Sequence, residues 1–177
     1  MIRRRAETSS RAFVAIDFET ANGSRESACA VAAVRVEDGV VSEKRRWLIR
    51  PPTREFSFTW LHGIAWSDVR AEPRFGAVWP EVMRLARGVE FLAAHNASFD
   101  RSVLAACARS ARIRLPATRF ECSMLLARRN LGIYPTTLPD VCRRLRIPLR
   151  HHDPLSDAEA CARIVIAAMG RPAAARS

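Results

Sequence analysis

Three stretches near the start of the chain have the apolar patterns and turn signals of β-strands. They comprise residues 12–18, 28–36 and 40–49. The run "FVAI" within the first stretch is apolar without interruption, which indicates a strand buried on both faces. Asp38-Gly39, between the second and third stretches, is a two-residue hairpin signal. The pattern therefore predicts an antiparallel meander of three strands.

Farther along the chain the apolar spacing becomes that of helices, with one further strand. Helices are predicted at residues 79–88, 97–111, 122–130, 136–147 and 153–170, and a fourth strand at 89–96. We place Pro80 in the first turn of the first helix and Gly88 at its end, and expect Thr137 to cap the fourth helix. Residues 50–63, with two adjacent prolines, read as a loop. This order predicts one α/β domain with a mixed sheet covered by helices.

Four acidic residues stand where strands end or helices begin. Asp17 and Glu19 close the first strand, and residues two apart in a strand point to one face. Asp100 and Asp157 lie early in predicted helices. Crowded carboxylates repel unless cations neutralise them, and oxygen-only ligands suit Mg²⁺ or Mn²⁺ rather than zinc. Two such ions could hold the attacking and leaving oxygens of a phosphoryl displacement.

His152 lies five residues before Asp157 and is the candidate to take a proton from the attacking water. Simpler interpretations stay open at this point. The strand-end acids could be surface termination, Asp100 a first-turn acid favoured by the helix dipole, and Asp157 the partner of an arginine. His152 could be a solvated bystander.

Charge and cysteine usage bear on the partner and the compartment. The formal charge is +11, and Lys44 is the only lysine, so arginine carries the excess. Arginine suits phosphate, which favours a nucleic-acid partner, and solubility with codon bias explains the charge equally well. Five widely spaced cysteines without a C-x-x-C pair argue against a disulfide framework or a zinc site and for a cytoplasmic protein.

The ends of the chain and its hydropathy complete the description of its organisation. No signal peptide and no run of membrane-spanning length is found, so no membrane association is expected. Residues 1–10, which are basic, and 171–177 are expected to be flexible tails around a domain at 11–170.

Four motifs occur in the order and spacing of a known family: "DFET", "LHGI", "AHNASFD" and "HHDPLSDA". Together they resemble the DnaQ-like 3′–5′ exonucleases of the DEDDh subgroup, which includes the epsilon-type proofreading subunit of bacterial DNA polymerase III. The resemblance covers residues 11–170. It implies an α/β, ribonuclease H-like fold, in which helices flank a mixed five-stranded sheet made of an antiparallel meander plus parallel strands.

The resemblance also implies roles for the residues above. The acids that match the ligands of the two metal ions, Mg²⁺ or Mn²⁺, are Asp17, Glu19, Asp100 and Asp157. His152 matches the general base, because the subgroup pattern H-x-A-x-x-D-A places histidine five residues before the last acid. The tyrosine subgroup would need a tyrosine where Asp153 stands. Pro154 departs from the usual alanine, and the neighbouring His151 has the wrong spacing.

Five further positions match nucleotide contacts of the family, namely Thr20, Leu61, His62, Asn96 and Phe99. The first resembles a residue that meets the terminal nucleotide, the next two resemble wedge and 3′-end contacts, and the last two line the same pocket. The Phe99 ring could stack on a base or be plain core, and His62 could be structural. His95 and the tryptophans, Trp47, Trp60, Trp66 and Trp79, are interpreted as packing or anchoring residues.

The expected function is a metal-dependent 3′–5′ exonuclease acting on single-stranded DNA. It would release nucleoside 5′-monophosphates with little sequence preference. The alternatives are an exoribonuclease of the oligoribonuclease or tRNA-trimming kind and a non-catalytic nucleic-acid-binding accessory domain. The short tail after Gly170 and the absence of glutamine do not support association with a polymerase. Repair, recombination and salvage stay open.

Overall fold

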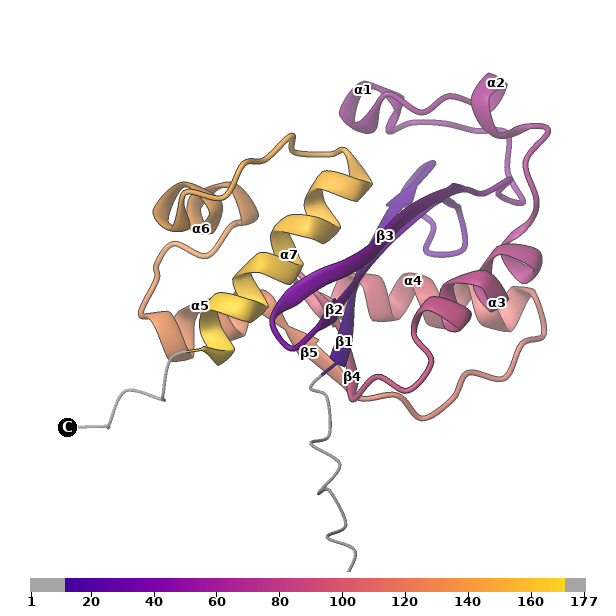
Figure 1. Cartoon of the computed structure of the whole chain (residues 1–177). Coiled ribbons are helices and arrows are strands. Elements are labelled where there is room, and N and C mark those ends of the chain that lie inside the picture. Colours follow the sequence, from indigo (N-terminus) through magenta and orange to yellow (C-terminus); the bar gives the residue numbers. More distant parts are fainter. Residues whose placement is uncertain (1–11, 171–177) are drawn as a thin grey trace, which may run out of the picture.

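A five-stranded mixed sheet forms the centre of the protein, which we describe from a computed structural model over residues 12–170. The strands are β1 (Ala12–Thr20), β2 (Ala28–Glu37), β3 (Val40–Leu48), β4 (Phe91–Ala94) and β5 (Phe120–Cys122). Their order is β3-β2-β1-β4-β5 (Figure 1). β1, β2 and β3 pair antiparallel, and β4 runs parallel to β1 and β5. The predicted meander and mixed sheet are confirmed.

Helices cover both faces of this sheet (Figure 1). The helices are α1 (Thr59–His62), α2 (Trp66–Val69), α3 (Phe75–Leu85), α4 (Ala97–Ser110), α5 (Ser123–Leu131), α6 (Leu138–Leu145) and α7 (Pro154–Met169). α3 and α4 pack on one face, and α7 packs on the other, with α5 and α6 beside it. The architecture is that of a ribonuclease H-like domain.

The pleat of β1 decides which face receives the acids. Val14 and Ile16 belong to the core beneath α3 and α4, whereas Phe13 and Ala15 belong to the core beneath α7. Because side chains alternate along a strand, Asp17 continues the row of Phe13 and Ala15. The strand therefore delivers its terminal carboxylates to the face that α7 covers.

Helix α3 differs from the sequence-based expectation at both of its ends. α3 begins at Phe75, four residues before the predicted start, because Phe75 and Val78 continue its buried face. Pro80 consequently lies inside the helix rather than in its first turn. Its position is exposed, so the carbonyl that loses a partner faces the solvent side. α3 also ends at Leu85, before the φ +73° turn at Gly88.

The segment read as a loop contains α1, and α2 follows it; neither helix was predicted. The hairpin at Asp38-Gly39 is confirmed by positive φ values at both residues, 50° and 79°. Thr137 caps α6 as predicted, since its side chain accepts from the Asp140 N–H.

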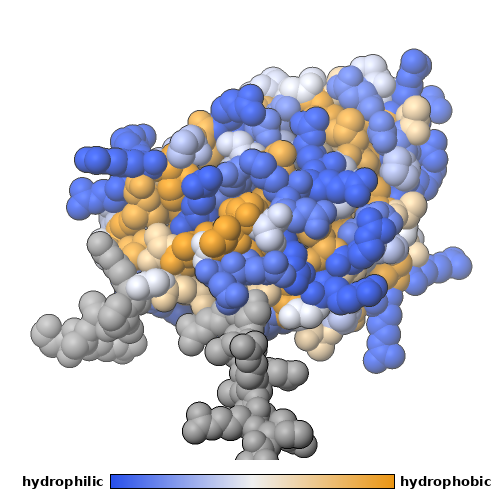
Figure 2. Space-filling view, viewed as in Figure 1, coloured by the Kyte–Doolittle hydropathy of each residue, from blue (hydrophilic) through white to orange (hydrophobic). Residues whose placement is uncertain are grey.

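Most aromatic and sulfur side chains pack as expected. Trp79 is buried in the main core, and all five cysteines are free thiols. Among the four tryptophans Trp60 is the exception, because it is 79% exposed on α1, so the expectation that it anchors the fold is wrong. Hydrophilic side chains cover much of the face that α7 and β3 present (Figure 2).

Within residues 12–170, no helix combines the length and the hydrophobicity needed to cross a bilayer. The tails expected at residues 1–10 and 171–177 lie outside the described residues.

Candidate active site

A cavity of about 360 Å³ opens where β1 ends, and four helices and a turn contribute to its walls. α1, α4, α6 and α7 supply walls, and the turn at 150–153 supplies two histidines. Nine of the ten residues selected from the sequence line it: Asp17, Glu19, Thr20, Leu61, Asn96, Phe99, Asp100, His152 and Asp157. Segments more than 130 residues apart in the chain thus meet in one cavity.

The four carboxylates enter this cavity from three elements. Asp17 and Glu19 come from the end of β1, Asp100 from the first turn of α4, and Asp157 from the first turn of α7. Carboxylate oxygens of Asp17, Glu19 and Asp157 lie within 4.8 Å of one another. Asp100 is fixed beside them, because its Oδ1 accepts the Phe18 N–H at 3.1 Å.

Burial and mutual repulsion make these carboxyls hard to ionise. Burial raises the pKa of Glu19 to about 8, with smaller contributions from Asp157 and Asp100. Burial likewise raises the pKa of Asp100 to about 7. The pKa of Asp17 is raised by burial and by its acidic neighbours, and that of Asp157 is raised by burial. Among the described residues that line the cavity, none is an arginine or a lysine.

The two carboxylate oxygens of Asp157 differ in their hydrogen-bond partners. Its Oδ2 accepts from the His152 N–H at 3.0 Å and lies 2.9 Å from His151 Nδ1. Its Oδ1 is buried and has no hydrogen-bond partner within the described part of the chain. Buried carboxylate oxygens without a donor are costly, and a hard divalent cation with oxygen ligands satisfies them. The residues present therefore fit a Mg²⁺ or Mn²⁺ site.

The turn that carries the two histidines has an unusual backbone. His152 adopts φ +68°, a left-handed conformation that is uncommon outside glycine. The turn directs the His152 N–H at Asp157 and stacks the two imidazole rings at 3.8 Å between centroids. Burial lowers the pKa of His152, and the charge of the neighbouring His151 lowers it further. A neutral ring is therefore available at pH 7.

His151 is a functional candidate that the sequence reasoning set aside. Its ring lines the cavity, and its Nδ1 contacts the Asp157 carboxylate, which only accepts hydrogen bonds when ionised. Nδ1 therefore carries the proton and donates. Adjacency to His152 was the only sequence signal, because the contact depends on the left-handed turn.

The residues selected for nucleotide contacts divide into two groups. Thr20, Leu61, Asn96 and Phe99 line the cavity and form a wall of mixed polarity. Phe99 also packs against the main core, and the Arg25 guanidinium lies 4.5 Å from its ring centroid. The structural and the functional interpretation of this ring are thus compatible.

His62 does not line the cavity, and both of its ring nitrogens have internal partners. Nε2 lies 3.1 Å from the Thr20 carbonyl, and Nδ1 accepts the Ile64 N–H at 3.1 Å. Burial lowers the pKa of His62, which agrees with a neutral ring that donates from Nε2. In this arrangement His62 ties α1 to the end of β1.

His95 has a comparable connecting role on the opposite wall. Its Nδ1 lies 2.8 Å from Ser123 Oγ, and its Nε2 lies 3.0 Å from the Thr136 carbonyl. Through these contacts it joins the end of β4 to the start of α5 and to the segment before α6. The packing role predicted for it agrees with this geometry.

Comparison with known proteins gives the same result from sequence and from fold. The family model described as "Exonuclease" matches residues 14–165. A protein of Mycobacterium tuberculosis whose name describes a bifunctional exonuclease/endonuclease is 34% identical over 129 residues, which cover 68% of this chain. The aligned part is 20% of that protein, so the chain spans about a fifth of its length.

Two solved structures share the fold over nearly their whole length. Exonuclease X, in complex with 5′ overhanging duplex DNA, superposes with a TM-score of 0.72 and 25% identity, covering 89% of this chain and 91% of that one. The nuclease domain of 3′hExo, a DEDDh family member bound to rAMP, gives a TM-score of 0.75 at 18% identity, covering 93% and 94%. The chain therefore belongs to the exonuclease family, and its fold is that of the DEDDh exonucleases.

Proposed function

We propose that the protein is a metal-dependent 3′–5′ exonuclease that removes nucleoside 5′-monophosphates from the 3′ end of single-stranded DNA. The observation that carries the proposal is the buried Asp157 Oδ1, which has no hydrogen-bond partner within the described chain, on a carboxylate that has an oxygen within 4.8 Å of oxygens of Asp17 and Glu19. A cluster of raised carboxyl pKa values in a cavity is typical of a functional site.

The carboxylates of Asp17, Glu19, Asp100 and Asp157 would hold two divalent ions, Mg²⁺ or Mn²⁺. Bound there, the ions would supply water activation and charge stabilisation for a phosphoryl displacement. His152 stands at the same cavity with a neutral ring, so it can accept the proton that the attacking water loses. The backbone N–H of His152 meanwhile holds Asp157 in place.

The remaining walls would position the terminal nucleotide. Leu61 and Phe58 offer apolar surface on the α1 side, and Phe99 offers an aromatic face on the α4 side. Asn96 and Thr20 add polar groups between them. Apolar surface and a few polar groups can hold a sugar and a base without reading the base edge, so little sequence preference is expected.

The choice of DNA over RNA rests on one comparison. Exonuclease X, the more similar of the two solved relatives in sequence, was captured with DNA. The 3′hExo domain was captured with rAMP, so RNA is the second polymer to test. Discrimination would depend on contacts to the 2′-hydroxyl beside the terminal sugar.

The test uses matched 20-nucleotide DNA and RNA oligomers, labelled at the 5′ end, with Mg²⁺, Mn²⁺ or EDTA. We expect a ladder that shortens from the 3′ end, requires metal and is faster on DNA. Asp17→Asn should abolish it, and Glu43→Gln, at an exposed carboxylate of β3, should not. Faster degradation of RNA would assign the exoribonuclease function. Binding of both polymers without any cleavage would leave a nucleic-acid-binding module.

A further inference from the structure

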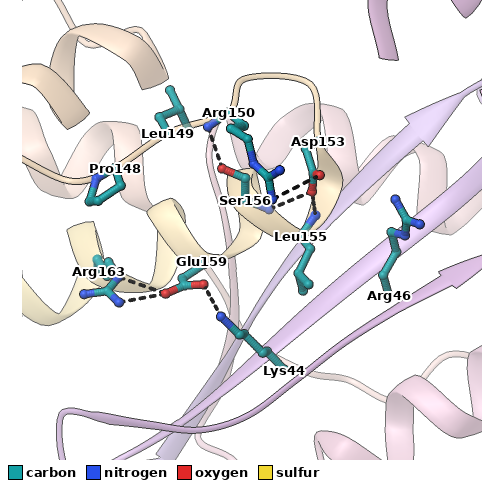
Figure 3. A pocket seen from close by; sticks show the side chains of 10 residues that line it. All are labelled: Lys44, Arg46, Pro148, Leu149, Arg150, Asp153, Leu155, Ser156, Glu159 and Arg163. Atoms are coloured by element: carbon teal, nitrogen blue, oxygen red, sulfur yellow. Dashed lines mark hydrogen bonds and ion pairs between the residues drawn. The ribbon is translucent and has the colours of Figure 1, made fainter. Parts of the chain in front are cut away.

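A second cavity, of about 500 Å³, lies between β3 and the first half of α7 (Figure 3). Its walls carry four cationic side chains, Lys44, Arg46, Arg150 and Arg163, and two carboxylates, Asp153 and Glu159. The walls therefore have an excess of two positive charges. These residues come from the edge strand, the turn before α7 and α7 itself.

The carboxylates do not neutralise all of these cations. Glu159 is shared, because it accepts from Lys44 Nζ at 2.7 Å and from Arg163 Nη2 at 2.7 Å. Asp153 Oδ1 caps α7, accepting from the Leu155 and Ser156 N–H groups. Both carboxylates are thus already engaged by cations or by N–H groups of the protein itself.

Two guanidinium groups are left available for a ligand. Arg150 Nη2 forms a long ion pair with Asp153 Oδ2, at 4.0 Å and without a hydrogen bond, and its side chain is 87% exposed (Figure 3). The Arg46 side chain has no ion pair or hydrogen bond to any residue of the described chain, and it stands on β3 across the cavity from Asp153 and Leu155 (Figure 3). Guanidinium forks match phosphate oxygens.

The second cavity shares a wall with the active site. Arg150 and Asp153 of the turn at 150–153 line the cationic cavity, whereas His151 and His152, between them, line the catalytic one. A ligand held by Arg46 and Arg150 therefore lies next to the catalytic turn.

The lining also indicates the chemical class of the ligand. Within residues 12–170, the cavity wall contains no aromatic side chain, so a base finds no ring there on which to stack. The cations are spread over three elements instead of converging on one buried point, which suits a chain of phosphates better than a single nucleotide.

We propose that this cavity binds the phosphodiester backbone of the polynucleotide substrate outside the catalytic cavity, with Arg46 and Arg150 as the phosphate contacts. The inference rests on the proposed nuclease function and adds a substrate feature, a preference for polymers over short esters. The binding is independent of base sequence and weakens with salt.

The binding arm of the test uses EDTA, so that no cleavage is needed. We would measure affinity for a fluorescent 20-nucleotide single strand by anisotropy between 50 and 300 mM KCl. Arg46→Glu should weaken binding on the order of tenfold, and Arg46→Ala should lower the slope of log affinity against log salt by about 0.7, the value for one phosphate contact. Arg46→Lys should restore most of the affinity. The control is Arg109→Glu, at an exposed arginine of α4 on the other face of the sheet.

The kinetic arm separates this inference from the proposed function. For each variant we would compare kcat/KM for the 20-nucleotide strand with kcat/KM for the p-nitrophenyl ester of thymidine 5′-monophosphate. A fall of about tenfold in this ratio for Arg46→Glu, and no fall for Arg109→Glu, supports the inference. The inference would be overturned if Arg46→Glu had the same ratio as the unaltered protein. It would also be overturned if poly-glutamate of equal charge displaced the strand from the protein. If the unaltered protein cleaves neither substrate, the proposed function fails, and the binding arm still decides about the cavity.

Discussion

At the scale of single residues, the two oxygens of Asp157 have different surroundings. Oδ2 is held by His151 and by the backbone of His152, while the buried Oδ1 has no partner in the described chain. Hydrogen bonds to Oδ2 fix the orientation of the carboxylate and therefore the direction in which Oδ1 points. Outer-shell partners orient metal ligands in the same way. His151 is therefore a positioning residue for Asp157.

Replacing His151 should weaken metal binding without removing the catalytic groups. We expect His151→Ala to raise the Mg²⁺ concentration for half-maximal nuclease rate by about 10- to 100-fold, with a smaller effect at saturating metal. His151→Asn should recover much of the loss, because its amide can donate near the position of Nδ1. An unchanged metal requirement in His151→Ala would show that Asp157 needs no support from this ring.

Replacing His152 should affect the rate instead. His152→Ala removes the proposed general base, so kcat should fall by about 10²- to 10⁴-fold. KM and the metal requirement should change little, because the backbone N–H that holds Asp157 is kept. Steady-state kinetics at saturating metal separate these quantities, and a kcat within twofold of the unaltered protein would exclude His152 as the base.

The order and spacing of the four acids and His152 indicated one site, and all five residues line one cavity in the structure. Their roles as metal ligands and general base stay predictions. The sequence could not predict the contact of His151, because that contact requires φ +68° at the next residue. It also left the position of His62 open. Whether that ring contacts a nucleotide or connects α1 to β1 depends on where α1 lies, and the apolar periodicity of the sequence does not predict α1.

At the scale of elements, long periodic segments were predictable and short ones were not. β1 and β2, α4 and α7 lie within two residues of their predicted bounds. α1 and α2 have four residues each, about one turn, so neither can show a repeat of 3.6. β5 has three residues and its place follows from pairing with β4 across the sheet, which is information that one segment does not contain.

The cap of α6 links an element to the active site. Thr137 Oγ1 accepts the Asp140 N–H at 3.4 Å and donates to Asp140 Oδ2 at 2.6 Å, and Thr137 also lines the catalytic cavity. Thr137→Ala should cost about 1 kcal/mol of unfolding free energy, with Thr137→Ser close to the unaltered protein. Urea unfolding measures this difference, and equal stability of the alanine variant would show that the cap contributes nothing.

At the scale of the whole molecule, the fold buries carboxylates that resist ionisation. The pKa values of about 8 for Glu19 and about 7 for Asp100 exceed the values near 4 of unfolded chains. The folded, metal-free protein thus binds these protons more tightly than the unfolded one. Protonation of Glu19 and Asp100 therefore stabilises the folded state. This stabilisation is complete below about pH 4 and is lost as pH rises through 7 and 8.

This linkage predicts the pH dependence of stability without metal. Between about pH 6.5 and 8 the unfolding midpoint should fall, because the histidines with lowered pKa values oppose the trend only below about pH 6.5. Glu19→Gln should reduce the fall and raise the midpoint at pH 8, by about 2–4 °C for each kcal/mol of repulsion removed. Differential scanning calorimetry in EDTA tests this, with Glu43→Gln as the surface control; a midpoint that rises over this range would contradict it.

The number of metal ions bound per chain shows whether these carboxylates are assembled to hold divalent cations. We would titrate the protein with Mn²⁺ at pH 7.5 by isothermal calorimetry, beside Asp17→Asn and Glu43→Gln. We expect two ions per chain for the unaltered protein and for Glu43→Gln, and the loss of at least one ion in Asp17→Asn. No binding at millimolar Mn²⁺, or the same number of ions in Asp17→Asn, would contradict this expectation.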